Sequence, residues 1–230
     1  PPPKMGGDLL SRWPHIKVER KTPPIEVDPK YGSLDCDTAM MLAFFDESPG
    51  SKILEVGSQE EYSAWILSDN GFDVTAVDLR EYQPPFLCNH KRIVGDFVEQ
   101  WGKLGIFDAI FSTSAIEHFG LNTYSEGIKD LGYDKKAMRA IAETVKPGGK
   151  VYITVPYGAN FFVSDPHWRI YNKETLQDRI IQNLKVEKKV FFKSADCSCP
   201  DVDNIVEEKD ADLYADESHH LTVLLITRRI

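Results

Sequence analysis

The feature that most restricts the fold of this chain is a regular alternation of short apolar segments and helix-length amphipathic segments from residue 52 onward. The short segments are rich in β-branched and aromatic residues, and the longer ones repeat apolar residues at helical spacing. The expected strands are residues 52–56, 73–77, 92–94, 107–112 and 150–155, and the expected helices are residues 60–70, 98–104 and 135–145. This alternation predicts βαβ units, and therefore a parallel sheet covered by helices on both faces.

The two ends of the chain depart from this pattern. Residues 1–33 hold seven of the 14 prolines, which block helix formation, so we expect a Pro-rich N-terminal arm before a single domain over residues 34–230 that opens with a helix near 34–45. A helix over 172–183 is followed by strands at 186–192 and 220–227 without a helix between them, which predicts an antiparallel addition at one edge. The expected fold class is α/β: a Rossmann-like, doubly wound, mostly parallel sheet with an antiparallel strand near the C-terminus.

Composition excludes several classes of function. A net charge of −9 over 230 residues gives no broad basic face for nucleic acid. No apolar run reaches the roughly 18 residues that a membrane-spanning helix needs. Four cysteines are too few for a disulfide scaffold in a chain of this length, so we expect a cytoplasmic protein with free thiols. Cys197 and Cys199 lack the spacing and further ligands of a zinc site, so no metal is predicted.

The loops that follow the predicted strands are the expected ligand site, because open parallel sheets bind ligands beyond the carboxyl ends of their strands. Gly57 follows the first strand, and a glycine lets the backbone approach a ligand closely. Asp78 follows the second strand, where a carboxylate can accept hydrogen bonds from ribose hydroxyls. Asp96 and Phe97 follow the third. Each signal is weak by itself, since an aspartate at a strand end is often a helix N-cap.

Taken together, these segments resemble the class I S-adenosylmethionine-dependent methyltransferases. The resemblance covers residues 50–193 and rests on ILEVG, VTAVDLR, VGDF, FDAIFSTSAIEH and VKPGGKVYITVP. It implies S-adenosyl-L-methionine as cofactor, with Glu55 and Gly57 at its methionine end, Asp78 at its ribose, and Asp96 with Phe97 at its adenine. The implied cofactor-binding residues are Glu55, Gly57, Ser58, Asp78, Leu79, Asp96, Phe97, Ser112 and Thr113.

One departure from the family pattern leaves alternatives open. Gln59 and Glu61 stand where the family has its second and third glycines, which would suit a non-catalytic subunit that keeps the fold without the cofactor. A nicotinamide-dependent dehydrogenase is disfavoured, because its G-x-G-x-x-G fingerprint retains only the first glycine here. Two adjacent acids, Glu60 and Glu61, would also repel a pyrophosphate.

The catalytic candidates lie after the fourth and fifth strands. An alcohol acceptor would benefit from a general base, whereas a carboxylate acceptor needs none. Glu117 and His118 follow the fourth strand and His167 follows the fifth; in the family a histidine often stands at the position of His118, near the transferred methyl group. His118 could equally be a loop histidine bonded to backbone, and Glu117 an N-cap or an ion-pair partner.

Aromatic and polar residues after the fifth strand are the substrate-binding candidates. Their mixture suits a pocket that stacks on a ring and bonds hydroxyl groups, although packing of the loop onto the sheet is the alternative. The candidates are Tyr157, Asn160, Phe162, Trp168 and Tyr171. The insertion at 119–134, with its glycines and tyrosines, predicts a cover over the acceptor.

SAIEHFG and WRIYNKETL resemble a branch of these enzymes tied to sugar and surface-glycan biosynthesis. The expected reaction is therefore O-methylation of a small polar acceptor such as a sugar or glycan intermediate, with a protein acceptor as the alternative.

An acidic loop at 196–217 accounts for eight of the nine net negative charges. A solvated loop is the simplest interpretation. A flap over the acceptor, a homodimer contact or a divalent-metal site are the functional alternatives.

Overall fold

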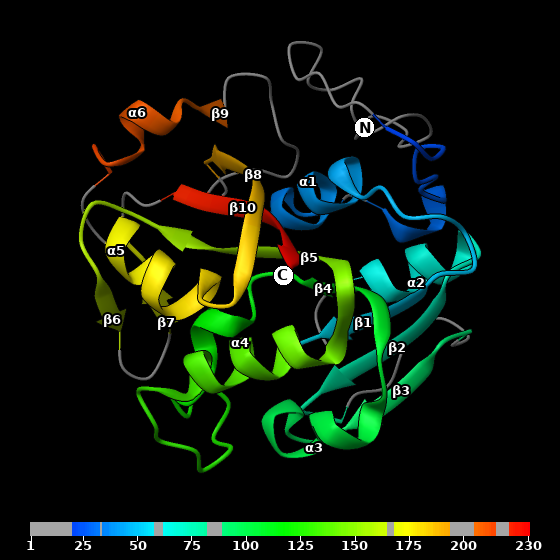
Figure 1. Cartoon of the computed structure of the whole chain (residues 1–230), viewed down its shortest axis with the longest axis horizontal. Helices are drawn as coiled ribbons and strands as arrows, with labels where there is room; N and C mark the ends of the chain where they lie inside the picture. The colour runs from blue at the N-terminus through cyan, green and yellow to red at the C-terminus, as the bar shows by residue number, and fades with distance from the viewer. Residues whose placement is uncertain are drawn as a thin grey trace.

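Eight strands form one sheet in the order β3-β2-β1-β4-β5-β10-β8-β9 (Figure 1) in a computed structural model that describes residues 20–32, 34–57, 62–81, 89–164, 168–193, 205–214 and 221–230. These strands are β1 (Lys52–Val56), β2 (Asp73–Asp78), β3 (Lys91–Val94), β4 (Phe107–Ser112), β5 (Val145–Tyr157), β8 (Leu184–Phe192), β9 (Ile205–Val206) and β10 (Leu221–Arg229). A separate hairpin pairs β6 (Phe162–Ser164) with β7 (Trp168–Ile170). The helices are α1 (Cys36–Phe44), α2 (Ser63–Asp69), α3 (Phe97–Leu104), α4 (Tyr133–Thr144), α5 (Lys173–Thr175) and α6 (Glu208–Ala211), together with the 3-10 helices η2 (Pro29–Tyr31) and η3 (Ile116–His118) and the π-helix η4 (Leu176–Ile181).

The predicted α/β class and mostly parallel sheet are confirmed. Strands β1 to β5 run parallel, and β10 pairs antiparallel with both β5 and β8. The predicted antiparallel addition at one edge of the parallel sheet is also confirmed, because β10 and then β8 follow β5 on that side. The residues of β10 are buried from Leu221 to Thr227, which fits its place between β5 and β8.

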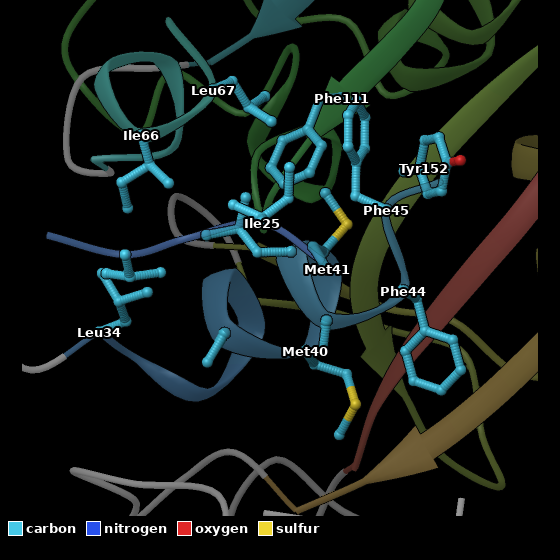
Figure 2. Packing of buried hydrophobic residues seen from close by; sticks show 14 of the residues in the cluster. Ile25, Leu34, Met40, Met41, Phe44, Phe45, Ile66, Leu67, Phe111 and Tyr152 are labelled. Carbon is cyan, nitrogen blue, oxygen red and sulfur yellow. The ribbon is translucent and has the colours of Figure 1, made fainter. Parts of the chain in front are cut away.

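Helices cover both faces of the sheet. Alternate residues of each strand serve opposite cores: Ile53 packs in the cluster with α1 and α2, whereas Leu54 packs in the cluster with α3 and α4. Figure 2 shows part of the first core, where Phe45, just after α1, meets Phe111 of β4 and Tyr152 of β5. The ring centroids of Phe45 and Tyr152 lie 4.9 Å apart. The continuous apolar character of the strands thus reflects burial on both faces.

The described part of the predicted N-terminal arm, residues 20–32, packs on the domain. Ile25, Val27 and Tyr31 are buried in the core that contains α1 and α2. The Tyr31 hydroxyl donates to Asp69 Oδ2 at 2.7 Å, at the end of α2. Proline excludes a helix here but leaves extended backbone free to lay apolar side chains on a neighbour. Residues 20–32 of the predicted arm therefore pack against the folded body.

A buried polar cluster ties the insertion at 119–134 to the sheet. Arg169 of β7 and Asp134 at the start of α4 are both fully buried, with Nε and Oδ2 3.6 Å apart. Arg169 Nη1 donates to the Phe119 carbonyl at 2.7 Å, and Nη2 donates to the Leu131 carbonyl at 3.3 Å. Asp134 also accepts from Arg179 and from the Tyr171 hydroxyl. One arginine thus fixes both ends of the insertion.

No helix in the described residues is long and apolar enough to cross a membrane.

Replacing Asp134 should destabilise the buried polar cluster around Arg169. Asp134→Ala leaves Arg169 buried without its carboxylate, so we expect a loss of about 3–5 kcal/mol in the free energy of unfolding. Urea denaturation measures it. Asp178→Ala is the control, because Asp178 pairs with Lys135 at 2.6 Å but is 64% exposed, and should cost at most about 1 kcal/mol. Equal losses in the two variants would contradict the account.

Candidate functional site

The site lies where the order of the sheet reverses. From β1 the chain proceeds outward through β2 and β3 on one side, and β4 and β5 lie on the other side. A cavity of about 740 Å³, counting the open space at its mouth, occupies the carboxyl ends of β1 to β4. This position is the one expected of a cofactor site in an open α/β sheet.

Gly57 forms the floor of the cavity just after β1. Its φ of 79° is in the left-handed region, and its N–H donates to the Val77 carbonyl at 2.8 Å. A Cβ at this position would lie 2.3 Å from Cβ of Ala115, which also lines the cavity. Only glycine therefore allows the loops after β1 and β4 to come this close.

Asp78 ends β2 and is 8% exposed. Its Oδ1 accepts from the Arg80 backbone N–H at 2.8 Å and from Arg80 Nε at 3.2 Å. The Arg80 guanidinium in turn lies 3.7 Å from the ring centroid of Tyr124, a residue of the 119–134 insertion. All three side chains line the cavity, so the insertion is linked to the acid of the second strand.

Asp96 is the N-cap of α3. Its Oδ1 accepts from the Val98 N–H at 2.8 Å, and its Oδ2 accepts from the Tyr133 hydroxyl at 2.5 Å. Burial, and secondarily the bond to Asp96, raise the pKa of Tyr133, which keeps it a neutral donor. Phe97 lies beside them and gives the cavity a buried aromatic wall, with 3% of its surface exposed.

The loop after β4 supplies polar groups to the opposite wall. Thr113 and Ser114 line the cavity, and His118 lines it from η3. Within the described residues, the buried Thr113 Oγ1 has no hydrogen-bond partner. A buried hydroxyl without a partner carries a desolvation penalty that a bound ligand would remove.

Three predicted site residues are buried outside the cavity lining. The Ser112 hydroxyl donates to the Val56 carbonyl at 3.0 Å, which joins β4 to β1. Glu55 is 1% exposed and accepts from Ser63; burial, with the nearby charge of Asp78, raises its pKa to about 8. Glu117 is 2% exposed, and burial raises its pKa well above the usual range, with the charge of Asp37 adding to the effect. These acids sit behind the wall of the cavity rather than on it.

The five predicted substrate-binding residues do not line the cavity. Tyr157 donates to Asp212 Oδ1 at 2.6 Å, and Tyr171 belongs to the buried cluster around Asp134. Phe162 and Trp168 lie in the β6–β7 hairpin, and Asn160 is exposed. Packing of this segment onto the sheet accounts for the tyrosines. Outside the described residues lie Ser58, Gln59, Glu60, Glu61, His167, Cys197 and Cys199.

The cavity is also lined by residues that were not expected from their position directly after a strand. The 119–134 insertion contributes Phe119, Gly120, Tyr124, Glu126, Ile128 and Tyr133. Its composition signalled a cover, but no pattern indicated which side chains turn inward. Ser114 also lines the cavity, in the segment Ser112 to Ser114 that the resemblance places beneath the cofactor, whereas no sequence signal assigns a role to Arg80.

The charged side chains of the described cavity wall favour a cation over a phosphate. Asp78, Asp96 and Glu126 are acidic, and Arg80 is the basic residue among the lining groups that the structure describes. Arg80 is already paired with Asp78. A pyrophosphate would meet net repulsion, whereas a positively charged ligand would be attracted. Among the same described residues, no group of three or more His, Cys, Asp or Glu could hold a metal ion.

Comparison with known proteins gives a family and a fold. The family described as "Methyltransferase domain" matches residues 33–190. No curated protein matches the sequence. The solved structure of the cyclase SpnF matches with a TM-score of 0.59 and 15% identity, over 84% of this chain and 80% of that one.

Two further structures share the fold. The 1,6-didemethyltoxoflavin-N1-methyltransferase of Burkholderia thailandensis, with bound 1,6-didemethyltoxoflavin and S-adenosylhomocysteine, matches with a TM-score of 0.54 and 13% identity, over 84% of this chain and 76% of that one. TrmN from Thermus thermophilus matches with a TM-score of 0.52 and 12% identity, over 84% of this chain. The chain spans 48% of TrmN, about half of its length. Identities this low establish a common fold and nothing about the ligand.

Gly57 provides a test of the close approach between the loops. Gly50→Ala is the matched control, because Gly50 has a φ of 86° with no atom within 4 Å of an added Cβ. The control should lose about 1–2 kcal/mol of stability from its backbone conformation alone. Gly57→Ala should lose about 1–3 kcal/mol more, because its Cβ also collides with Ala115. Thermal unfolding measures both, and similar losses would show that the loops are further apart than described.

Proposed function

Because the chain belongs to the family of methyltransferase domains, we propose that it transfers a methyl group from S-adenosyl-L-methionine to an oxygen atom of a small polar acceptor. The observation that carries the proposal is the convergence of Gly57, Asp78, Asp96 and Phe97 in one acidic cavity at the switch point of the sheet. These four residues come from three strand ends separated along the sequence.

The cavity fits this cofactor better than a nicotinamide dinucleotide. S-adenosylmethionine has no phosphate group and carries a sulfonium cation, which the excess of acids over bases in the described wall would favour. Asp78 would accept hydrogen bonds from the ribose hydroxyls, and Asp96 with Phe97 would receive the adenine. The Thr113 hydroxyl, which has no partner among the described residues, would form a hydrogen bond with the ligand.

When bound, the cofactor supplies an electrophilic methyl group whose bonding electron pair with sulfur stays on the sulfur as the methyl leaves. The protein must align an acceptor oxygen with that methyl group and exclude water. His118 lines the cavity and is proposed to take the proton of the acceptor hydroxyl as the new oxygen–carbon bond forms. Glu117 is buried behind the wall and is assigned no such role.

The finer parts of the proposal rest on sequence alone. A sugar or glycan intermediate remains one candidate acceptor, but the comparisons give that branch no support. The structure of the Burkholderia thailandensis enzyme contains bound 1,6-didemethyltoxoflavin, and SpnF is named a cyclase, so the fold serves varied small molecules. We further propose a cytoplasmic location and a homodimer. The alternative functions are methylation of a protein acceptor and a non-catalytic role as a partner subunit.

Asp78 should control cofactor affinity. Asp78→Asn keeps the size of the side chain but removes a charged hydrogen-bond acceptor, which is worth about 1.5–3 kcal/mol, or roughly 10- to 100-fold in affinity. Isothermal titration with S-adenosylhomocysteine measures this change. Asp73→Asn is the matched control at the exposed start of the same strand, and should bind as wild type does. An unchanged affinity in Asp78→Asn would refute the assignment of Asp78 to the ribose.

His118 should control turnover rather than cofactor binding. A positioned general base contributes about 10²- to 10⁴-fold, so His118→Ala should lower kcat at least about 100-fold for an alcohol acceptor. The assay follows a deuterated methyl group from S-adenosylmethionine into a panel of small hydroxyl, amine and carboxyl compounds. His90→Ala, which removes a histidine outside the cavity lining, is the control. If His118→Ala retains full turnover while chemistry limits the rate, His118 is not the base.

A further inference from the structure

Ser114 stands in the cavity wall with an unusual backbone conformation. Its φ of 40° lies in the left-handed region, which a serine rarely adopts. The Ser114 N–H donates to Thr154 Oγ1 of β5 at 2.9 Å, which fixes the turn after β4. Such conformations persist where the surrounding structure enforces them, often at functional sites. The conformation keeps Ser114 among the residues that line the cavity.

The Ser114 hydroxyl donates to a buried carboxyl behind the wall. Its partner is Oδ2 of Asp37, a residue of α1 that is 77 positions away in the sequence. Asp37 is 8% exposed, and its Oδ1 has no hydrogen-bond partner within the part of the chain that the structure describes. The same described residues give Asp37 no ion pair. A buried carboxyl without a cation is destabilising when charged, so an uncharged residue would serve the fold better.

The surroundings of Asp37 make it titrate near neutrality. Burial, followed by the charge of Asp35 on the same helix, raises the pKa of Asp37 to about 7, while the Ser114 and Thr222 hydroxyls act in the opposite direction. Glu117 of η3 is a second buried acid close enough to interact with it. The named neighbours from β5 and β10 are Thr154 and Thr222, which carry no charge. Arg169, the nearby cation, acts on Glu117 and is bonded to the insertion.

The direction of the hydrogen bond decides what Ser114 offers to the cavity. When Asp37 is ionised it has no proton, so Ser114 must donate its only hydroxyl hydrogen to Asp37. Any hydrogen bond between Ser114 Oγ and a ligand in the cavity must then use the lone pairs of the oxygen. A ligand group beside Ser114 must donate a hydrogen bond, and a carboxylate, which only accepts, would be left unpaired beside a buried negative charge.

We propose that Ser114, held by Asp37, selects the methyl acceptor as a hydroxyl or amine compound and discriminates against carboxylates. The assignment rests on the proposed function of the same cavity: among oxygen acceptors it favours a hydroxyl over a carboxylate, and it also admits an amine, which donates a hydrogen bond as a hydroxyl does. Ser114 is the specificity-determining residue that contacts the acceptor, and Asp37 is a positioning residue that acts through Ser114. His118 keeps its separate role in receiving the proton.

This arrangement makes selectivity depend on pH. Below the pKa of Asp37 the carboxyl is protonated and can donate to Ser114 Oγ, which frees the serine hydrogen for the cavity. Discrimination against carboxylates should therefore increase as pH rises through about 7. The change should appear in KM, because Ser114 binds the acceptor and does not move its proton.

The test compares wild type with Asp37→Asn, Ser114→Ala and the control Asp35→Asn. Asp35 is the exposed N-cap of the same helix, and asparagine caps a helix as well as aspartate does. The probes are benzyl alcohol, benzylamine and benzoate in the deuterated-methyl assay at pH 6 and pH 8. Wild type and Asp35→Asn should favour the alcohol or the amine over benzoate at least about 10-fold in kcat/KM at pH 8. Wild type should do so by less at pH 6, whereas Asp35→Asn should keep more of the preference there, because loss of the Asp35 charge lowers the pKa of Asp37. Asp37→Asn and Ser114→Ala should lose that preference, mainly through KM.

Thermal unfolding at pH 8 separates a functional role of Asp37 from a structural one. Asp37→Asn removes a buried charge while keeping an acceptor for Ser114, so its unfolding temperature should exceed that of wild type at pH 8 and match it more closely at pH 5. A variant less stable than wild type at pH 8 would overturn the proposal, because Asp37 would then be retained for the fold.

Three results of the transfer assay would also overturn it: benzoate as the best probe, an unchanged preference in Asp37→Asn, or binding of S-adenosylhomocysteine by a wild-type protein that methylates neither the alcohol nor the amine. Absence of S-adenosylhomocysteine binding by wild type would instead contradict the proposed function.

Discussion

The divergence of the chain on either side of β1 and β4 is the constraint from which the site follows. Parallel strands present their carboxyl ends at one edge, and the loops after β1 and β4 leave in opposite directions around one gap. Gly57 and Ala115 meet at that gap with no room for another carbon. Asp78 at the end of β2 and Asp96 after β3 border the same space, so four strand ends define one cavity before any ligand is considered.

The insertion after β4 completes the cavity because it is held at both ends. Arg169 bonds carbonyl groups at its start and finish, while Tyr124 and Tyr133 reach Arg80 and Asp96 inside the cavity. The buried acids behind the cavity wall make the stability of the fold depend on pH. Folding favours the neutral forms of Asp37 and Glu55, whose pKa values are raised to about 7 and about 8. Their contribution to stability is therefore greatest at acidic pH and declines as pH rises toward those values.

Local patterns predicted the strands and helices well, because burial on both faces leaves continuous apolar runs and the strand-end residues follow from them. Asp78, Asp96, Phe97 and His118 lie where such reasoning placed them, on the cavity wall. The antiparallel addition beside β5 was predicted, but the order of β10 and β8 within it was not, since short apolar runs do not show which strand pairs with β5. The aromatic candidates Tyr157 and Tyr171 carry polar tips that pair inside the fold, which composition cannot distinguish from pairing with a ligand. The bond between Ser114 and Asp37 joins residues that only the tertiary structure brings together.

The central claim is that this cavity binds an S-adenosyl cofactor and rejects a dinucleotide. Isothermal titration of the wild-type chain with S-adenosylhomocysteine and, separately, with NAD tests that claim without knowledge of the acceptor. The account predicts saturable binding of one S-adenosylhomocysteine per chain and no measurable heat with NAD. Binding of NAD, or no binding of S-adenosylhomocysteine by the folded protein, would contradict it.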